Sequence, residues 1–240
     1  TGANRTVTLG NATLDLEFGF VPNAGDSFTI IDNVGSGSTV IGGFAGMPEG
    51  AVFTLVGQVF SISYQGGVDS NDTVVTTLGA IDTTVVLDGS NNLLIQGGDG
   101  DDSLTLESDT ANSQIVIHDP SNLLSTEISG ATRPDANTVI VPFSAFTGSQ
   151  IIVDTQDGND ELTIDFSLGK FSQSVLYLGG TGVNDVLNLQ GEGSFATGVF
   201  DYIDSNSGSI ALSGNAIIEY GELAPINSTL EIADVTLNFG

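Results

Sequence analysis

The chain has 240 residues, of which 30 are Asp or Glu and only 3 are Lys or Arg, so its formal net charge at pH 7 is -27. Such a chain repels nucleic-acid phosphates and anionic membrane surfaces, because binding to either needs Lys and Arg. The absence of Cys excludes disulfide bonds and thiolate metal sites. No apolar run reaches the length of a membrane-spanning helix, and we expect no membrane insertion.

Apolar and polar residues alternate with a period of two along most of the chain, which is typical of half-buried β-strands. In chain order the clearest runs are residues 14–20, 60–64, 104–106, 162–166, 187–189, 210–212, 230–232 and 237–239. Each run is short and ends at Gly, Asn, Asp or Pro. The pattern predicts an all-β fold of roughly 15 to 20 short strands with negligible α-helix.

A Gly-rich acidic turn recurs four times, each time before an alternating strand. Its copies occupy residues 66–72, 97–102, 157–160 and 179–185, and stacking them would bury one continuous core. We therefore predict a right-handed parallel β-solenoid (β-helix), and leave open a portion that resembles a β-sandwich. A boundary near residues 78–83 predicts two regions, 1–80 and 81–240, although one continuous solenoid also fits.

The sequence Gly-Gly-Asp-Gly-Asp-Asp-Ser-Leu-Thr at 97–105 matches every fixed position of the nonapeptide of calcium-binding β-rolls. Calcium prefers hard oxygen ligands, which carboxylates and exposed carbonyls of such turns provide. We interpret all four turns as candidate Ca²⁺ sites, with these candidate ligands: Asp69, Asp72, Asp99, Asp101, Asp102, Asp157, Asn159, Asp160, Asn184 and Asp185. The alternative is an ordinary turn in which Asp and Gly serve the backbone geometry.

Catalytic signatures are missing from the sequence. His118 is the only histidine, so a zinc or catalytic role would lack companions, and we expect a surface residue at a strand end. A polysaccharide lyase would need a basic residue, and only Arg5, Arg133 and Lys170 are available. We expect that the protein is not an enzyme.

Two segments carry a family resemblance. Residues 8–75 resemble the repeat of bacterial autotransporter-like β-helical passenger regions, in the words at 24–33 (AGDSFTIIDN), 43–51 (GFAGMPEGA) and 62–67 (ISYQGG). Residues 84–226 resemble the acidic-turn repeats of giant planctomycete-type surface proteins and close on EYGELAPI at 219–226. The resemblance implies an exported, repetitive protein of the cell surface or matrix, without enzyme activity. The resemblance also implies that region 1–80 is an autotransporter-like repeat and that region 81–240 is a stack of solenoid repeats with acidic turns.

The predicted function is therefore a non-catalytic structural or adhesive segment of a secreted bacterial surface or extracellular fibre protein, stabilised by Ca²⁺. Expected partners are other copies of the chain, neighbouring repeats of a longer chain, or cell-surface glycans. Two alternatives stay open. An exposed cleft lined by aromatic rings would favour a carbohydrate-binding module, and a cleft holding Arg133 or Lys170 against carboxylates would favour a β-helical enzyme that acts on polysaccharides.

Overall fold

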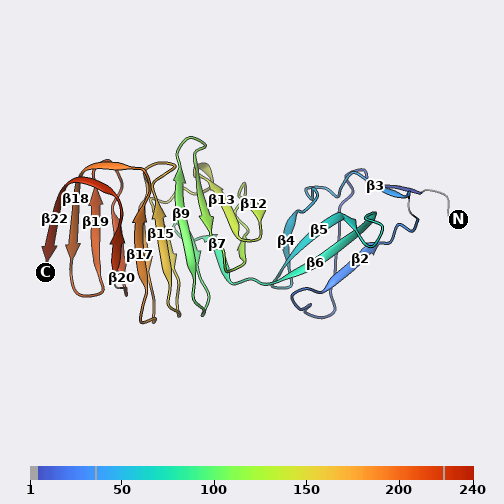
Figure 1. Ribbon diagram of the computed structural model, residues 1–240, viewed down its shortest axis with the longest axis horizontal. Helices are drawn as coiled ribbons and strands as arrows, with labels where there is room; N and C mark the ends of the chain where they lie inside the picture. Colours follow the sequence, from blue (N-terminus) through green and yellow to red (C-terminus); the bar gives the residue numbers. More distant parts are fainter. Residues whose placement is uncertain (1–4, 36, 224) are drawn as a thin grey trace. The chain divides into compact units, whose positions relative to one another are not determined.

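The computed structural model describes residues 5–35, 37–223 and 225–240 and contains 22 β-strands in four sheets (Figure 1). The helical content of these residues is one 3₁₀ turn, η1 (Phe143–Ala145). The all-β class predicted from the alternating pattern is thus confirmed. No helix in this part of the chain is long and apolar enough to cross a membrane.

The chain divides into two compact units. Unit 1 runs to Ile81 and includes Pro134–Ala136, and unit 2 contains Asp82–Arg133 and Asn137–Gly240. Each unit has its own group of buried apolar side chains.

Unit 1 consists of a four-stranded antiparallel sheet in the order β2-β6-β5-β4 and a two-stranded parallel sheet, β1-β3. The strands are β1 (Thr6–Thr8), β2 (Ser27–Ile31), β3 (Thr39–Ile41), β4 (Val52–Leu55), β5 (Gln58–Gly66) and β6 (Asp72–Ala80). The centre of its core is formed by Phe60, Ile62, Tyr64 and Val75.

Two segments of unit 1 that carry the family resemblance, 43–51 and 62–67, meet around the hydroxyl of Tyr64. This hydroxyl donates to the carbonyl of Met47 at 2.7 Å and accepts the N–H of Phe44 at 2.9 Å. The carboxylate of Glu49 accepts the N–H of Tyr64 at 2.7 Å. A Cβ at Gly43 would lie 2.9 Å from the Met47 carbonyl, which explains glycine there. The segment 43–51 therefore forms a packed turn.

Unit 2 consists of two facing sheets. The nine-stranded sheet contains, in spatial order, β11 (Leu124–Thr126), β7 (Thr83–Leu87), β8 (Leu93–Gln96), β14 (Gln150–Asp154), β16 (Ser174–Leu178), β20 (Ile218–Gly221), β19 (Gly208–Leu212), β18 (Ser194–Tyr202) and β22 (Glu231–Phe239). The seven-stranded sheet contains β12 (Thr132–Asp135, of which Pro134 and Asp135 are grouped with unit 1), β13 (Thr138–Pro142), β10 (Gln114–His118), β9 (Ser103–Asp109), β15 (Glu161–Asp165), β17 (Val186–Gln190) and β21 (Ile226–Ser228).

The chain of unit 2 passes repeatedly from one sheet to the other. It goes from β8 to β9, from β14 to β15, from β16 to β17 and from β20 to β21, and each of these strands pairs in parallel with its equivalent in the next pass. Antiparallel pairs interrupt the pattern, so both sheets are mixed. No closed solenoid is detected in the described ranges, and the β-helix predicted from the sequence is not established by the strand pairing.

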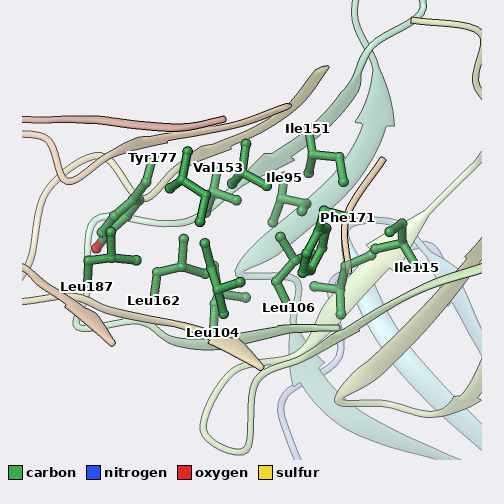
Figure 2. Close-up of a cluster of buried hydrophobic side chains, with 14 of the residues drawn as sticks. Ile95, Leu104, Leu106, Ile115, Ile151, Val153, Leu162, Phe171, Tyr177 and Leu187 are labelled. Carbon is green, nitrogen blue, oxygen red and sulfur yellow. The ribbon is translucent and has the colours of Figure 1, made fainter. Parts of the chain in front are cut away.

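In-register pairing places like residues in rows across unit 2. One row contains Leu104, Leu162 and Leu187, and each of these side chains is at most 2% exposed. Figure 2 shows the two sheets directing apolar side chains toward each other: Ile95, Val153 and Tyr177 from one, and Leu104, Leu162 and Leu187 from the other. Because every second residue points inward, the core is filled by side chains along the parallel strands.

We predict that Leu162→Ala lowers the free energy of unfolding of unit 2 by about 3 kcal/mol, because the removed atoms leave a cavity in a fully buried row. Urea unfolding followed by tyrosine fluorescence measures this change. Val183→Ala is the matched control, since Val183 is 84% exposed, and it should shift stability by less than about 0.5 kcal/mol. Equal effects of the two substitutions would contradict the described core.

Candidate functional site

Three of the four acidic turns stack on one another in unit 2. Residues 97–102, 155–160 and 179–185 connect the paired strands of the two sheets, so the in-register pairing brings the turns together. Backbone hydrogen bonds join them, including Glu161 N–H to the Asp102 carbonyl at 2.9 Å and Val186 N–H to the Asp160 carbonyl at 2.7 Å. The fourth turn, 66–72, belongs to unit 1.

The last residue of each stacked turn is a buried aspartate. Asp102, Asp160 and Asp185 are only 1%, 1% and 2% exposed. Asp160 Oδ1 accepts the N–H of Asp102 at 2.8 Å, and Asp185 Oδ1 accepts the N–H of Asp160 at 2.9 Å. We call these three residues the aspartate ladder. The carboxylates of Asp160 and Asp185 thus each accept a backbone N–H of the neighbouring turn, which links adjacent passes of the chain at the corner of the sheets.

A polar cap closes the Asp102 end of the ladder. Asn122 Nδ2 donates to Asp102 Oδ1 at 2.7 Å, and the fully buried Asp119 accepts the N–H of Ser103 at 3.0 Å. Neither Asp119 nor Asn122 belongs to the candidate ligands predicted from the sequence. A signal was present, because Asp119 continues the alternation of Ile115 and Ile117 and so faces inward.

Two buried carboxylate oxygens of the ladder accept no hydrogen bond from the described residues. Oδ2 of Asp102 and Oδ2 of Asp160 are buried and have no hydrogen-bond partner within the described residues. Burial raises the pKa of Asp102 to about 7, and the nearby charges of Asp82, Asp160 and Asp119 act in the same direction against the hydrogen bond from Asn122. Burial also raises the pKa of Asp160. Asp102 therefore takes up a proton near neutral pH, far above the usual range of Asp.

Glycine is required where the turns pack against the ladder. A Cβ on Gly97 would overlap Oδ2 of Asp102, and one on Gly182 would overlap the carboxylate of Asp185. Gly180 has φ +80°, and a Cβ there would overlap the carbonyl of Gln156. These glycines allow the backbone to approach the neighbouring turn closely.

The other predicted ligands of the stacked turns lie on the outside. Asp101 Oδ1 accepts the N–H of Asn159 at 2.8 Å, and Asn184 Nδ2 donates to Asn159 Oδ1 at 3.2 Å. Asp157 accepts the hydroxyl of Thr181, and Asp99 is exposed. The structure thus separates a buried row from an exposed row. Within the described ranges, no group of three or more His, Asp or Glu side chains is arranged to hold a metal ion.

The turn of unit 1 is built differently. Asp72 Oδ1 accepts the N–H of Asn33 at 2.8 Å, and Asp69 is exposed. The buried residue of this turn is Asn71, whose Nδ2 donates to the carbonyl of Gly35 at 2.9 Å. Asp69 and Asp72 are therefore not equivalent to the ladder residues of unit 2.

The basic and imidazole groups weighed for catalysis have structural contacts. His118 Nδ1 lies 3.1 Å from Thr138 Oγ1 on the neighbouring strand. Lys170 Nζ donates to the carbonyl of Ser213 at 2.9 Å and lies 4.2 Å from the centre of the Phe195 ring. Lys170 therefore joins two segments of unit 2 and contacts an aromatic face.

Compared with protein-family models, curated proteins and solved structures, the chain matches none of them. The resemblance to autotransporter-like and planctomycete-type repeats stays a prediction. The stacked turns are the feature from which a function can be argued.

We predict that the free energy of unfolding rises as the pH falls from 8 to 5 in a chelator-containing buffer. The folded-state pKa of Asp102, about 7, exceeds the usual 3.8, so the folded protein binds the extra proton and is stabilised as the pH drops through 7. For one proton the slope is at most about 1.4 kcal/mol per pH unit. Urea unfolding at several pH values measures it.

The matched variant is Asp102→Asn, which keeps the shape of the side chain and its acceptor oxygen but cannot titrate. The variant should show a clearly flatter dependence on pH, because the proton uptake of Asp102 is absent from it. An unchanged slope in Asp102→Asn would show that the ladder is not the source of the effect.

Proposed function

We propose that this chain is a non-catalytic structural segment of an exported surface protein, with unit 2 built as a right-handed β-solenoid that antiparallel hairpins interrupt. The support is the repeated passage between two sheets with parallel pairing in register. Rows of like side chains fill the space between the sheets. Such a stack gains stability from contacts between neighbouring passes and needs no bound substrate.

The aspartate ladder is the single observation that carries this proposal. A catalytic carboxylate must reach its substrate, whereas Asp102, Asp160 and Asp185 are at most 2% exposed. The oxygens of Asp160 and Asp185 accept backbone N–H groups of the adjoining turn. The most repetitive chemical feature of the sequence therefore serves to hold turns together.

An extracellular surface location is the setting that fits this architecture best. The net charge of -27 keeps such a chain soluble and away from polyanions. The resemblance of residues 8–75 and 84–226 to surface-protein repeats supports the same setting, with adhesion to glycans or to other copies as its use.

Calcium is the proposed stabilising ion of the stacked turns. The chemistry of the donors fits, because buried carboxylate oxygens of Asp102 and Asp160 lack a partner, and a buried uncompensated charge is costly. Exposed oxygens of Asp99, Asp101 and Asp157 lie in the same turns. When bound, the ion would supply positive charge to a corner that is rich in carboxylates.

We predict that calcium raises the melting temperature of the protein more than magnesium does at equal concentration and pH 8. Both ions screen the net charge, but magnesium resists dehydration and requires strict octahedral geometry. A hundredfold excess over the dissociation constant would stabilise by about 2.7 kcal/mol. Melting curves followed by circular dichroism, in chelator, magnesium and calcium, measure the difference.

Asp102→Asn should lose the excess effect of calcium, whereas Glu192→Gln, which removes one exposed charge from unit 2, should keep it. Equal shifts with the two ions, together with an unchanged response of Asp102→Asn, would rule out a specific site in these turns.

A carbohydrate-binding module is the second candidate, and one observation favours it. The ring of Phe239 is 75% exposed and stacks on Tyr202 with centroids 5.2 Å apart. Both rings line a shallow hollow together with Asp204 and Ser205. An exposed ring beside polar groups is a surface on which a sugar ring can stack.

We expect no turnover of acidic or neutral polysaccharides by the purified chain. Lys170 contacts Ser213 and Phe195, and the carboxylates of Asp160 and Asp185 accept backbone N–H groups. Assays of reducing ends and unsaturated products test turnover, and calorimetric titration tests binding. Turnover that Lys170→Met abolishes would establish the enzyme alternative, and binding that Phe239→Ala abolishes would establish the carbohydrate-binding module.

A further inference from the structure

The row of inward side chains in the nine-stranded sheet changes character at Tyr177. In-register pairing continues this row from Ile95 through Val153 to Tyr177. The first two side chains are aliphatic, whereas Tyr177, which is also 0% exposed, brings a hydroxyl group into the core. Figure 2 shows the Tyr177 ring directed toward Leu187, which follows the ladder residue Asp185 by two positions. The hydroxyl therefore reaches toward the corner at which the acidic turns are stacked.

The hydroxyl of Tyr177 is buried and has no hydrogen-bond partner within the described residues. Burial raises the pKa of Tyr177 far above its usual range, and the negative charges of the aspartate ladder act in the same direction, against the hydroxyl of Thr155. All three ladder residues thus lie close enough to Tyr177 to act on it. A buried tyrosine hydroxyl usually finds a partner, so an unpaired one points to a ligand that the side chain contacts.

Thr155 lies beside the side chains of this corner. It is fully buried, and its hydroxyl donates to the carbonyls of Leu178 and Gly179 at 3.3 and 3.4 Å. The same hydroxyl acts to lower the pKa of both Asp160 and Tyr177, which places it next to both side chains. Because the hydroxyl is used as a donor, its oxygen keeps lone pairs that can coordinate a cation.

Asp102 approaches the same threonine. A Cβ on Gly97 would overlap Oδ2 of Asp102 and would lie 3.1 Å from Cα of Thr155. Oδ2 of Asp102 and Oδ2 of Asp160 are both buried without a hydrogen-bond partner in the described part of the chain. Three unpaired oxygens therefore gather near Thr155. We call the four residues Asp102, Thr155, Asp160 and Tyr177 the inner corner.

A cation is the ligand that suits these atoms. Two of the four side-chain oxygens belong to carboxylates, and hard oxygen donors of this kind bind Ca²⁺. A water molecule could donate hydrogen bonds to the carboxylates, but only a cation compensates their buried charge. Asp99 and Asp101 are exposed on the outer side of the same turns, where they attract cations electrostatically without being needed as ligands.

We propose that calcium binds in the inner corner, with Oδ2 of Asp102, Oδ2 of Asp160 and the hydroxyl oxygens of Thr155 and Tyr177 as ligands, and not in the exposed row of the turns. The proposal rests on the proposed calcium role of the stacked turns and names the atoms that perform it. Backbone carbonyls or water complete the coordination sphere. The ion joins three passes of the chain, because Asp102 precedes β9, Thr155 and Asp160 lie between β14 and β15, and Tyr177 belongs to β16.

Terbium luminescence tests the contact with Tyr177 directly. Tb³⁺ binds to calcium sites through the same oxygen donors, and it emits when a tyrosine in its immediate vicinity absorbs ultraviolet light. The chain has four Tyr and no Trp, so single substitutions identify the tyrosine responsible. The natural protein should show tyrosine-sensitised emission that excess calcium removes, and Tyr177→Phe should lose this emission.

Tyr220→Phe is the matched control. Tyr220 pairs in register with Tyr177 on the next strand, is 5% exposed, and has a buried hydroxyl that is also unpaired within the described ranges. Burial raises the pKa of Tyr220, and the groups that add to this effect are Tyr202, Asp204 and Asp201 rather than the ladder. Tyr220→Phe should therefore keep the sensitised emission. Both variants retain the aromatic ring in the core, and circular dichroism checks that both fold.

Melting curves in calcium and in magnesium separate this proposal from the proposed function. Tyr177→Phe should lose most of the excess stabilisation by calcium, whereas Asp99→Asn, which removes an exposed carboxylate of the same turns, should keep it. Loss of the excess in Asp99→Asn, or its retention in Tyr177→Phe, would overturn the inner corner and leave the calcium role of the turns standing. Sensitised emission that survives Tyr177→Phe would also overturn it. Equal shifts with the two ions in the natural protein would refute the calcium role and the inner corner together.

Discussion

The structure of unit 2 depends on the register between parallel strands of successive passes. A slip of one residue would turn the row that contains Leu104 and Leu162 toward solvent and the neighbouring polar row into the core. The same register places Asp160 Oδ1 at the N–H of Asp102. Hydrophobic burial and turn hydrogen bonding therefore require the same alignment, and each stabilises the alignment that the other needs.

The sequence could predict the all-β class and the recurring turns, because both are local patterns. It could also have predicted the direction of the ladder residues. Asp102 has the parity of Leu104 and Leu106, and Asp160 has that of Leu162, so both face inward, whereas Asp101 faces outward. A ligand prediction that counts every carboxylate of a turn as equivalent overlooks this difference in direction.

Which strands pair with one another could not be predicted from the sequence, for a different reason. The first two ladder residues are 58 positions apart and the next two are 25 apart, because β10, β11, β12 and β13 intervene once. Unequal spacing hides a repeat that is regular in space.

The ladder has a consequence for how such a chain can change over generations. The third stacked turn, 179–185, has seven residues where 97–102 and 155–160 have six, and yet the following strands stay in register. The extra length is accommodated in an outward bend that contains Val183, 84% exposed, while Asp185 returns to the ladder position. A buried aspartate just before each strand thus fixes the register of that strand with its neighbour. The outer part of the turn can then accept an insertion. Insertions on the outer side of these turns should therefore cost little stability, and surface loops can lengthen there without altering the core.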